Sequence, residues 1–125
     1  MVTLTLPWPP SVNHYWRMWR GRMLISRKGR QYRDAVVAIV RATQVKPLLG
    51  PLAIHIELFP PDARRRDVDN ALKALNDSLE HGGAFVDDSQ IVWLLIEKSS
   101  NVRGGKVIVR ICQCGPPPIV RSGIS

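Results

Sequence analysis

The chain is poor in several residue types, and each shortage excludes a class of protein. Its 125 residues include two cysteines, Cys112 and Cys114. A lone Cys-x-Cys pair cannot supply the four ligands of a structural zinc site. The three histidines, His14, His55 and His81, are scattered and have no ligand spacing. We therefore expect neither a zinc centre nor a disulfide framework.

Long apolar runs are also missing. No window reaches the roughly 20 uninterrupted apolar residues that a membrane span needs. The N-terminus opens with the alternating segment 2–6, followed by Pro7. It lacks the basic start and the long apolar stretch of a signal peptide. These features predict a cytoplasmic protein.

Acidic residues are fewer than basic ones. Ten Asp and Glu stand against eighteen Lys and Arg, which gives a net charge of +8. Hydrophobic residues make up 45% of the chain, as in a packed globule. The length fits a single domain that buries about two-thirds of its unfolded surface. A basic domain of this size typically binds nucleic acid, although a ribosome-like basic protein would have the same charge.

Periodicity predicts four strands and two helices. Strands are expected at 2–6, 52–59, 91–96 and 106–111, with a further short one at 23–26. The strand at 91–96 is expected to be buried, and 101–105 is expected to be a hairpin turn that pairs it with 106–111. A helix is predicted over 28–43, from the apolar stripe Tyr32, Ala35, Val36, Ile39 and Val40.

The second helix is expected to begin near Asp69 or Asn70, since either side chain can cap a helix. It would run to Glu80, with Leu72, Leu75 and Leu79 in the core, and end at Gly82-Gly83. The fold class is thus α+β: one small domain with a mixed or antiparallel sheet and two principal helices. The domain is expected to cover 1–112, and 113–125 is expected to be a flexible tail.

One segment places carboxylates inside this basic chain. It reads Arg64-Arg65-Arg66-Asp67-Val68-Asp69-Asn70, with Lys73 next and Asp87-Asp88 further on. Basic residues attract phosphate, whereas carboxylates repel it unless a divalent metal lies between them and the phosphate. A cluster of both signs therefore fits a metal-dependent nuclease better than a passive nucleic-acid binder.

The spacing is consistent with that chemistry. In an extended segment Asp67 and Asp69 would share one face, and Asp69, Lys73 and Asp77 would follow at four-residue steps along one helix face. Two or three carboxylates suffice for Mg²⁺, which would activate a water for attack on phosphate. Lys73 would stabilise the negative charge that develops, and Asp87-Asp88 would add a ligand.

A purely structural interpretation uses the same residues. Asp-x-Asp-Asn before a helix is an ordinary cap, and Asp87-Asp88 is an ordinary turn. Lys73 would then form a surface ion pair with Asp69 or Asp77, worth roughly 0.3–0.5 kcal/mol. The local pattern by itself leaves both interpretations open.

Beyond this local pattern, the chain resembles the RusA family of Holliday junction resolvases from about Leu4 to Ile111. The resemblance rests on motifs that occur in order along the chain: Leu6-Pro7-Trp8-Pro9-Pro10-Ser11-x-Asn13, Ser26, Gly29, Tyr32-Arg33, Pro61-Asp62, Arg65-Arg66-Asp67-Val68-Asp69-Asn70, Lys73, Asp87-Asp88-Ser89-Gln90-Ile91-Val92 and Gly104-Gly105.

The resemblance implies a small homodimeric endonuclease of bacteria, phages and prophages that cuts two opposed strands of a four-way DNA junction. The implied cofactor is Mg²⁺, with Mn²⁺ as a substitute. The implied catalytic residues are Asp67, Asp69, Lys73 and Asp88. The implied metal ligands are the three aspartates, with Asp87 as a weaker candidate. Asp77 is expected to be a surface or supporting residue.

The DNA-binding surface is expected to be basic, so that affinity falls steeply with salt. The candidates are Arg17, Arg20, Arg22, Arg27, Lys28, Arg30, Arg64, Arg65 and Arg66. Four aromatic residues are candidates either for base stacking or for packing: Trp8, Trp16, Trp19 and Phe85. Two other functions stay open at this point, a junction-binding protein without catalysis and a nuclease for flaps or other branched DNA.

Overall fold

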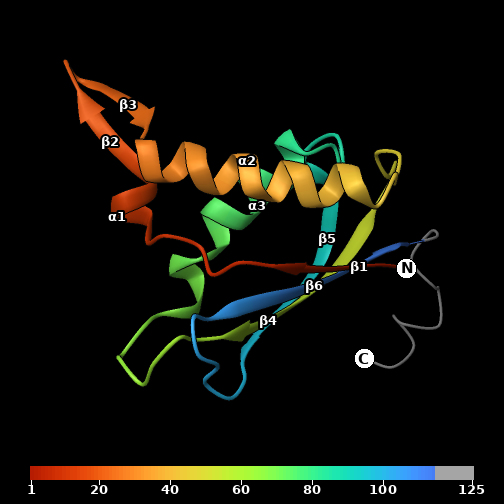
Figure 1. Ribbon diagram of the computed structural model, residues 1–125. Helices are drawn as coiled ribbons and strands as arrows, with labels where there is room; N and C mark the ends of the chain where they lie inside the picture. Colours follow the sequence, from red (N-terminus) through yellow and green to blue (C-terminus); the bar gives the residue numbers. More distant parts are fainter. Residues whose placement is uncertain (115–125) are drawn as a thin grey trace, which may run out of the picture.

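The body of the protein is one mixed sheet with helices on one of its faces (Figure 1). The computed structural model describes residues 1–114. The sheet contains β1 (Val2–Leu6), β4 (Leu52–Phe59), β5 (Ile91–Lys98) and β6 (Lys106–Gln113), in the order β1-β6-β4-β5. β6 is antiparallel to both of its neighbours, whereas β4 and β5 are parallel.

Two helices, α2 (Arg27–Ala42) and α3 (Leu72–His81), cover the same face of the sheet (Figure 1). Alternation along β4 sends Leu52, Ile54, Ile56 and Leu58 into the core beneath them. Each such buried side chain contributes roughly 1.5–3 kcal/mol through the hydrophobic effect. The helices bury Tyr32, Val36 and Val40 from α2 and Leu75 and Leu79 from α3, which confirms the predicted stripes.

A small hairpin projects past the N-terminal end of α2 (Figure 1). It follows the single turn α1 (Val12–Tyr15) and consists of β2 (Trp16–Trp19) and β3 (Arg22–Ile25). Its two-residue turn is Arg20-Gly21, with φ of 47° and 71°. Positive φ at both turn residues is the geometry that matches the twist of a tight hairpin.

The predicted strands and helices are confirmed to within a few residues, but the prediction for the C-terminal half of the sheet is wrong in two ways. β5 is an edge strand rather than a buried one, and it leaves Val92, Trp93, Leu94 and Leu95 exposed. Its partner is β4, not β6, because β4 lies between them. The loop 99–105 therefore crosses the end of β4, where Ser99 N–H donates to the Leu58 carbonyl at 2.7 Å.

β6 extends two residues past the predicted strand 106–111. Gln113 is the last residue of β6, and Cys114 N–H donates to the Pro51 carbonyl at 2.8 Å. The rest of the predicted tail, 115–125, lies outside the described residues. Within the described part of the chain, no helix has the length and apolarity to cross a membrane.

Candidate active site

Asp67 and Asp69 lie between the end of β4 and the start of α3. Asp67 is extended, and a 3₁₀ turn, η1 (Val68–Asn70), follows it. Both carboxylates are exposed. The predicted cap is wrong: α3 begins after Ala71 without any side-chain cap. The Asn70 Oδ1 instead accepts from the Val12 N–H at 3.2 Å and so ties η1 to α1.

Because Asp69 precedes α3, only Lys73 and Asp77 share the helix face that the spacing predicted. Lys73 is exposed in the first turn. In residues 1–114, the side chains of Asp67, Asp69 and Lys73 form no hydrogen bond or ion pair with any other protein group. The ion pair expected from the structural interpretation is therefore not formed, and these three groups are available to a ligand.

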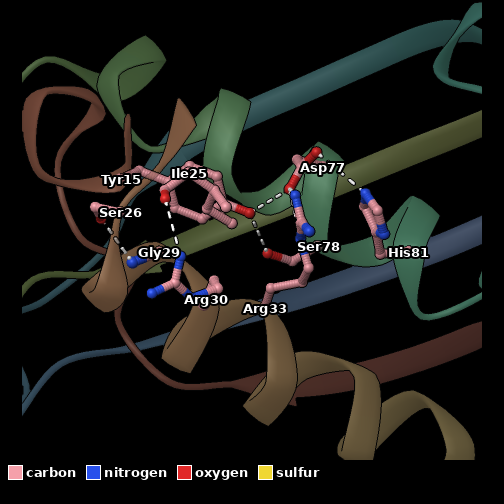
Figure 2. Close-up of polar contacts among 9 residues, drawn as sticks. All are labelled: Tyr15, Ile25, Ser26, Gly29, Arg30, Arg33, Asp77, Ser78 and His81. Atoms are coloured by element: carbon pink, nitrogen blue, oxygen red, sulfur yellow. Dashed lines mark hydrogen bonds and ion pairs between the residues drawn. The ribbon is translucent and has the colours of Figure 1, made fainter. Parts of the chain in front are cut away.

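Asp77, which was expected to be a surface or supporting residue, lies in a network of hydrogen bonds and ion pairs. Its Oδ2 accepts from the Tyr15 hydroxyl and from Arg33 Nε and Nη2, at 3.1 and 3.0 Å for the two nitrogens, and His81 Nε2 lies 3.7 Å from Oδ1 (Figure 2). Burial, together with the Asp77 carboxylate, raises the pKa of Tyr15. The network joins α1, α2 and α3, and Asp77 lies four residues after Lys73 on α3.

Asp87 and Asp88 have different surroundings although they are adjacent. Asp87 caps the 3₁₀ turn η2 (Asp88–Gln90): its Oδ2 accepts from the Ser89 hydroxyl at 2.9 Å, and Gln90 Oε1 accepts from its backbone N–H at 2.9 Å. The hydrogen bonds from Ser89 lower the pKa of Asp87. The Asp88 side chain is exposed and forms no ion pair with a basic side chain in residues 1–114; its neighbours are other carboxylates.

One acidic residue of this region was missed by the sequence analysis. Glu80, in the last turn of α3, accepts from the Asp88 N–H at 3.0 Å. Ligand atoms of Glu80, Asp87 and Asp88 lie within 4.8 Å of one another, and no other such trio of His, Cys, Asp or Glu occurs in the described chain. No local pattern marks Glu80, because only the chain reversal at Gly82-Gly83 brings it to Asp88.

The structure places Asp67 and Asp88 at opposite ends of β5. Asp67 follows β4 and Asp88 precedes β5, and these two strands are parallel. Asp67 lines a pocket together with Lys98, the last residue of β5. Eight residues of strand span about 25 Å, whereas Mg²⁺ binds oxygen at about 2.1 Å. One copy of the chain therefore does not bring Asp67 and Asp88 to the same ion.

The pocket beside Asp67 has a volume of about 310 Å³. It lies between the proline-rich loop 7–10, α1 and the loop that follows β4. Its polar lining comprises Ser11, His14, Arg64, Arg66, Asp67, Asn70 and Lys98. Asp62 holds Arg66 at 2.8 Å, with the guanidinium 5.7 Å from the centre of the Trp8 ring. The same Arg66, together with Arg64, lowers the pKa of Asp62 to about 2.

The nine basic candidates fall into three groups on the structure. Arg17, Arg20 and Arg22 lie on the hairpin, Arg27, Lys28 and Arg30 in the first turn of α2, and Arg64, Arg65 and Arg66 in the loop after β4. All are exposed except Arg66, which is half-buried. Arg64 and Arg66 line the Asp67 pocket, and the hairpin is connected to it through α1, whose His14 also lines the pocket.

The four aromatic candidates separate by burial. Phe85 is fully buried, so it packs in the core and does not stack on a base. Trp8 and Trp16 are partly buried against the same core. Trp19 is 47% exposed on the hairpin and is the most exposed of the four.

Comparisons with known proteins agree with the family resemblance of the sequence. The family described as Endodeoxyribonuclease RusA matches residues 7–112. A crossover junction endodeoxyribonuclease of Enterobacteria phage 82 is 42% identical over 113 residues, which cover 90% of this chain and 94% of that protein. Those of Shigella sonnei and Escherichia coli K12 are 42% and 41% identical over 114 residues, or 90% of this chain and 95% of theirs. The chain therefore belongs to the RusA endodeoxyribonuclease family.

Proposed function

We propose that the protein is a magnesium-dependent endonuclease that resolves four-way DNA junctions by paired, symmetric phosphodiester hydrolysis. It would act in recombination and repair, in the cytoplasm of a bacterium or of a phage-infected cell. Family membership supports the nuclease activity. The observation that carries the mechanism is the set of exposed side chains at Asp67, Asp69, Lys73 and Asp88, which form no ion pair in residues 1–114, in a chain of charge +8.

Each member of this set has a chemical role. Asp67, Asp69 and Asp88 provide oxygen ligands, and hard cations such as Mg²⁺ accept oxygen ligands and retain several waters. When bound, the metal would lower the pKa of a coordinated water and offset negative charge on the phosphate. Lys73 adds a positive charge where the leaving oxygen becomes negative. The arginines hold the DNA backbone through its phosphates.

The separation of Asp67 from Asp88 indicates how the set is assembled. We infer that each metal site combines Asp67 and Asp69 of one protomer with Asp88 of the partner subunit. If two copies of β5 pair antiparallel across a two-fold axis, the start of each strand lies beside the end of the other. The turn that holds Asp88 then meets the partner's loop at Asp67. Such a dimer has two identical sites, as paired cuts require.

The surface of β5 supports this arrangement. β5 is an edge strand, so its outer backbone groups have no sheet partner within the described chain. It also exposes four apolar side chains: Val92 is 64% exposed, Trp93 50%, Leu94 38% and Leu95 43%. An exposed apolar edge strand is a template for pairing with a second chain.

A cleavage assay with wild-type protein tests the proposed function. A labelled four-way junction and a linear duplex of matched sequence are incubated with and without Mg²⁺. We expect symmetric cuts that are confined to the junction and depend on the metal. Tight junction binding without cuts in Mg²⁺ or Mn²⁺ would identify a non-catalytic binding protein. Equal cutting of flaps would identify a nuclease of broader specificity.

Mixing two inactive variants tests the shared site separately. Asp67→Asn and Asp88→Asn are each expected to be inactive as homodimers. In the mixed dimer, one site contains both substitutions and the other contains neither. We expect the mixture to nick one strand per junction. If the mixture stays inactive although sedimentation and subunit exchange show mixed dimers, the ligands are not shared between subunits.

A further inference from the structure

The β2–β3 hairpin sorts its side chains onto two faces with different chemistry. Its register pairs Trp16 with Ile25, Arg17 with Leu24, Met18 with Met23, and Trp19 with Arg22. Because neighbouring residues alternate between faces, one face is entirely apolar, with Trp16, Met18, Met23 and Ile25. The other face carries Arg17, Trp19, Arg22 and Leu24.

The face with Trp19 has the composition of a nucleic-acid contact. The Trp19 ring is 47% exposed, and the Arg20 guanidinium lies 4.5 Å from its centre. Arg22 is directly opposite Trp19 across the hairpin. Within the described part of the chain, no carboxylate pairs with Arg17, Arg20 or Arg22. An aromatic ring stacks on bases of any sequence, and free guanidinium groups bind phosphate.

The base of the hairpin is rigidly attached to the helices (Figure 2). Tyr15, directly before β2, is fully buried, and its hydroxyl donates to Asp77 of α3. Ser26, directly after β3, donates its N–H to the Tyr15 carbonyl at 2.8 Å. Gly29 of α2 packs so closely that an added Cβ would collide with that carbonyl. The hairpin is therefore fixed relative to α3, the helix that carries Lys73.

The dimensions of the hairpin suit an insertion into DNA. Each strand has four residues, which corresponds to a projection of about 13 Å. The two-residue turn at Arg20-Gly21 keeps the tip narrow. The major groove of DNA, about 12 Å wide, admits a two-stranded ribbon of this kind. Because its base is fixed, the hairpin loses little backbone conformational entropy on binding.

We propose that this hairpin enters the branch point of a DNA junction, where Trp19 stacks on a nucleobase that has lost a stacking neighbour. Arg17 and Arg22 bind the phosphates on either side of that base. In a linear duplex every internal base is already stacked on both faces, so the hairpin favours branched DNA over linear DNA. The inference rests on the proposed function, because the ligand is the junction that the active site cuts.

Binding measurements on three variants test the proposal. The probes are a four-way junction and a linear duplex closed by loops at both ends, in EDTA so that no cleavage occurs. Stacking contributes about 1–3 kcal/mol per base, so Trp19→Ala should weaken junction binding roughly 5- to 150-fold. Trp19→Phe should keep most of the affinity. Met18→Ala, on the opposite face and 63% exposed, is the matched control.

The linear duplex and the salt dependence separate stacking from charge. Trp19→Ala should bind the closed duplex within about twofold of wild type and keep the same slope of affinity against salt. Arg22→Gln should instead lower that slope by about 1, as expected for one lost phosphate contact. Circular dichroism confirms that each variant is folded.

Three results would overturn the proposal. The first is that Trp19→Ala binds the junction with wild-type affinity. The second is that Trp19→Ala loses affinity by the same factor for the junction and for the closed duplex. The third is a Trp19→Ala variant that sediments as a monomer, which would make the hairpin a subunit contact. If one of these results is obtained but the wild-type protein still cuts junctions in Mg²⁺, the hairpin proposal is wrong and the proposed function is retained. If wild type neither prefers nor cuts the junction, both proposals fail together.

Discussion

The two principal helices begin in opposite ways. At the start of α2, the Ser26 side chain accepts from the Gly29 N–H at 2.9 Å and caps the helix. At the start of α3, Asp67, Asp69 and Asn70 are all residue types that cap well, yet the helix begins after Ala71 with no side-chain cap. A good cap contributes about 1 kcal/mol. The chain does without this contribution at the start of α3, where the proposed metal ligands lie.

The same contrast occurs within one dipeptide. Asp87 uses its carboxylate to cap η2 through Ser89, whereas the Asp88 carboxylate caps no turn and pairs with no basic side chain in residues 1–114. Groups with satisfied hydrogen bonds stabilise the fold, and exposed groups without partners are free to bind a ligand. This distinction is consistent with Asp88, rather than Asp87, as the proposed ligand of the pair.

The largest expected effect on cleavage comes from Asp67 and Asp69, the carboxylates that do not cap α3. Asp69→Asn, or Asp67→Asn, should abolish junction cleavage, because it removes a charged ligand of the metal. Junction binding should be unchanged or tighter, since a charge that repels phosphate is lost. Gel-based cleavage and binding assays measure the two properties on the same protein. A normal cutting rate in either variant would rule out the assigned metal site.

The next effect concerns Lys73. Lys73→Ala should reduce cleavage by roughly 10²–10³-fold, the usual consequence of losing one charge-stabilising group. The fold should be unaffected, because the side chain is exposed and contacts no partner in residues 1–114. Single-turnover cleavage and a urea melt of the same sample provide the two readouts. A large drop in the urea midpoint would instead make Lys73 a structural residue.

A stability comparison tests the difference between the two helix starts directly. Ser26→Ala should lower the free energy of unfolding by about 1 kcal/mol, because it removes a cap. Asp69→Ala should change it by less than about 0.5 kcal/mol, as is usual for an exposed residue without partners. Urea denaturation measures both. Equal losses would show that Asp69 stabilises α3 after all, and would contradict the contrast drawn here.

The smallest effect is a pH dependence at the loop that precedes the site. Arg66 and Arg64 lower the pKa of Asp62 from 3.8 to about 2 in the folded protein. The folded state therefore binds fewer protons than the unfolded state between these values. The resulting stabilisation is complete above about pH 4 and is lost as the pH falls toward 2.

A carbon-13 NMR titration of the Asp62 carboxyl group checks this prediction. Arg66→Gln provides the control, since it should return the Asp62 pKa toward its ordinary value. An Asp62 that titrates near pH 4 in the wild-type protein would show that the ion pair with Arg66 does not persist in solution.

Local sequence patterns predicted most of the elements correctly. The alternation at 52–59 gives β4 with its exact bounds, and the stripe from Tyr32 to Val40 gives α2 within one residue. The prediction was wrong where residues distant in the chain decide the outcome. The apolar run at 91–96 is equally compatible with a buried strand and with an exposed edge strand, and its partner strand is not encoded in its own residues.

The sequence by itself determined the family, the α+β class and the residues with chemical potential, because motif identity and periodicity are local properties of the chain. Only the tertiary structure decided which carboxylates are used in caps, that Glu80 lies beside Asp88, and that Asp67 and Asp88 lie at opposite ends of β5. The physical reason is the parallel pairing of β4 with β5. It places the loop after β4 and the turn before β5 a full strand length apart.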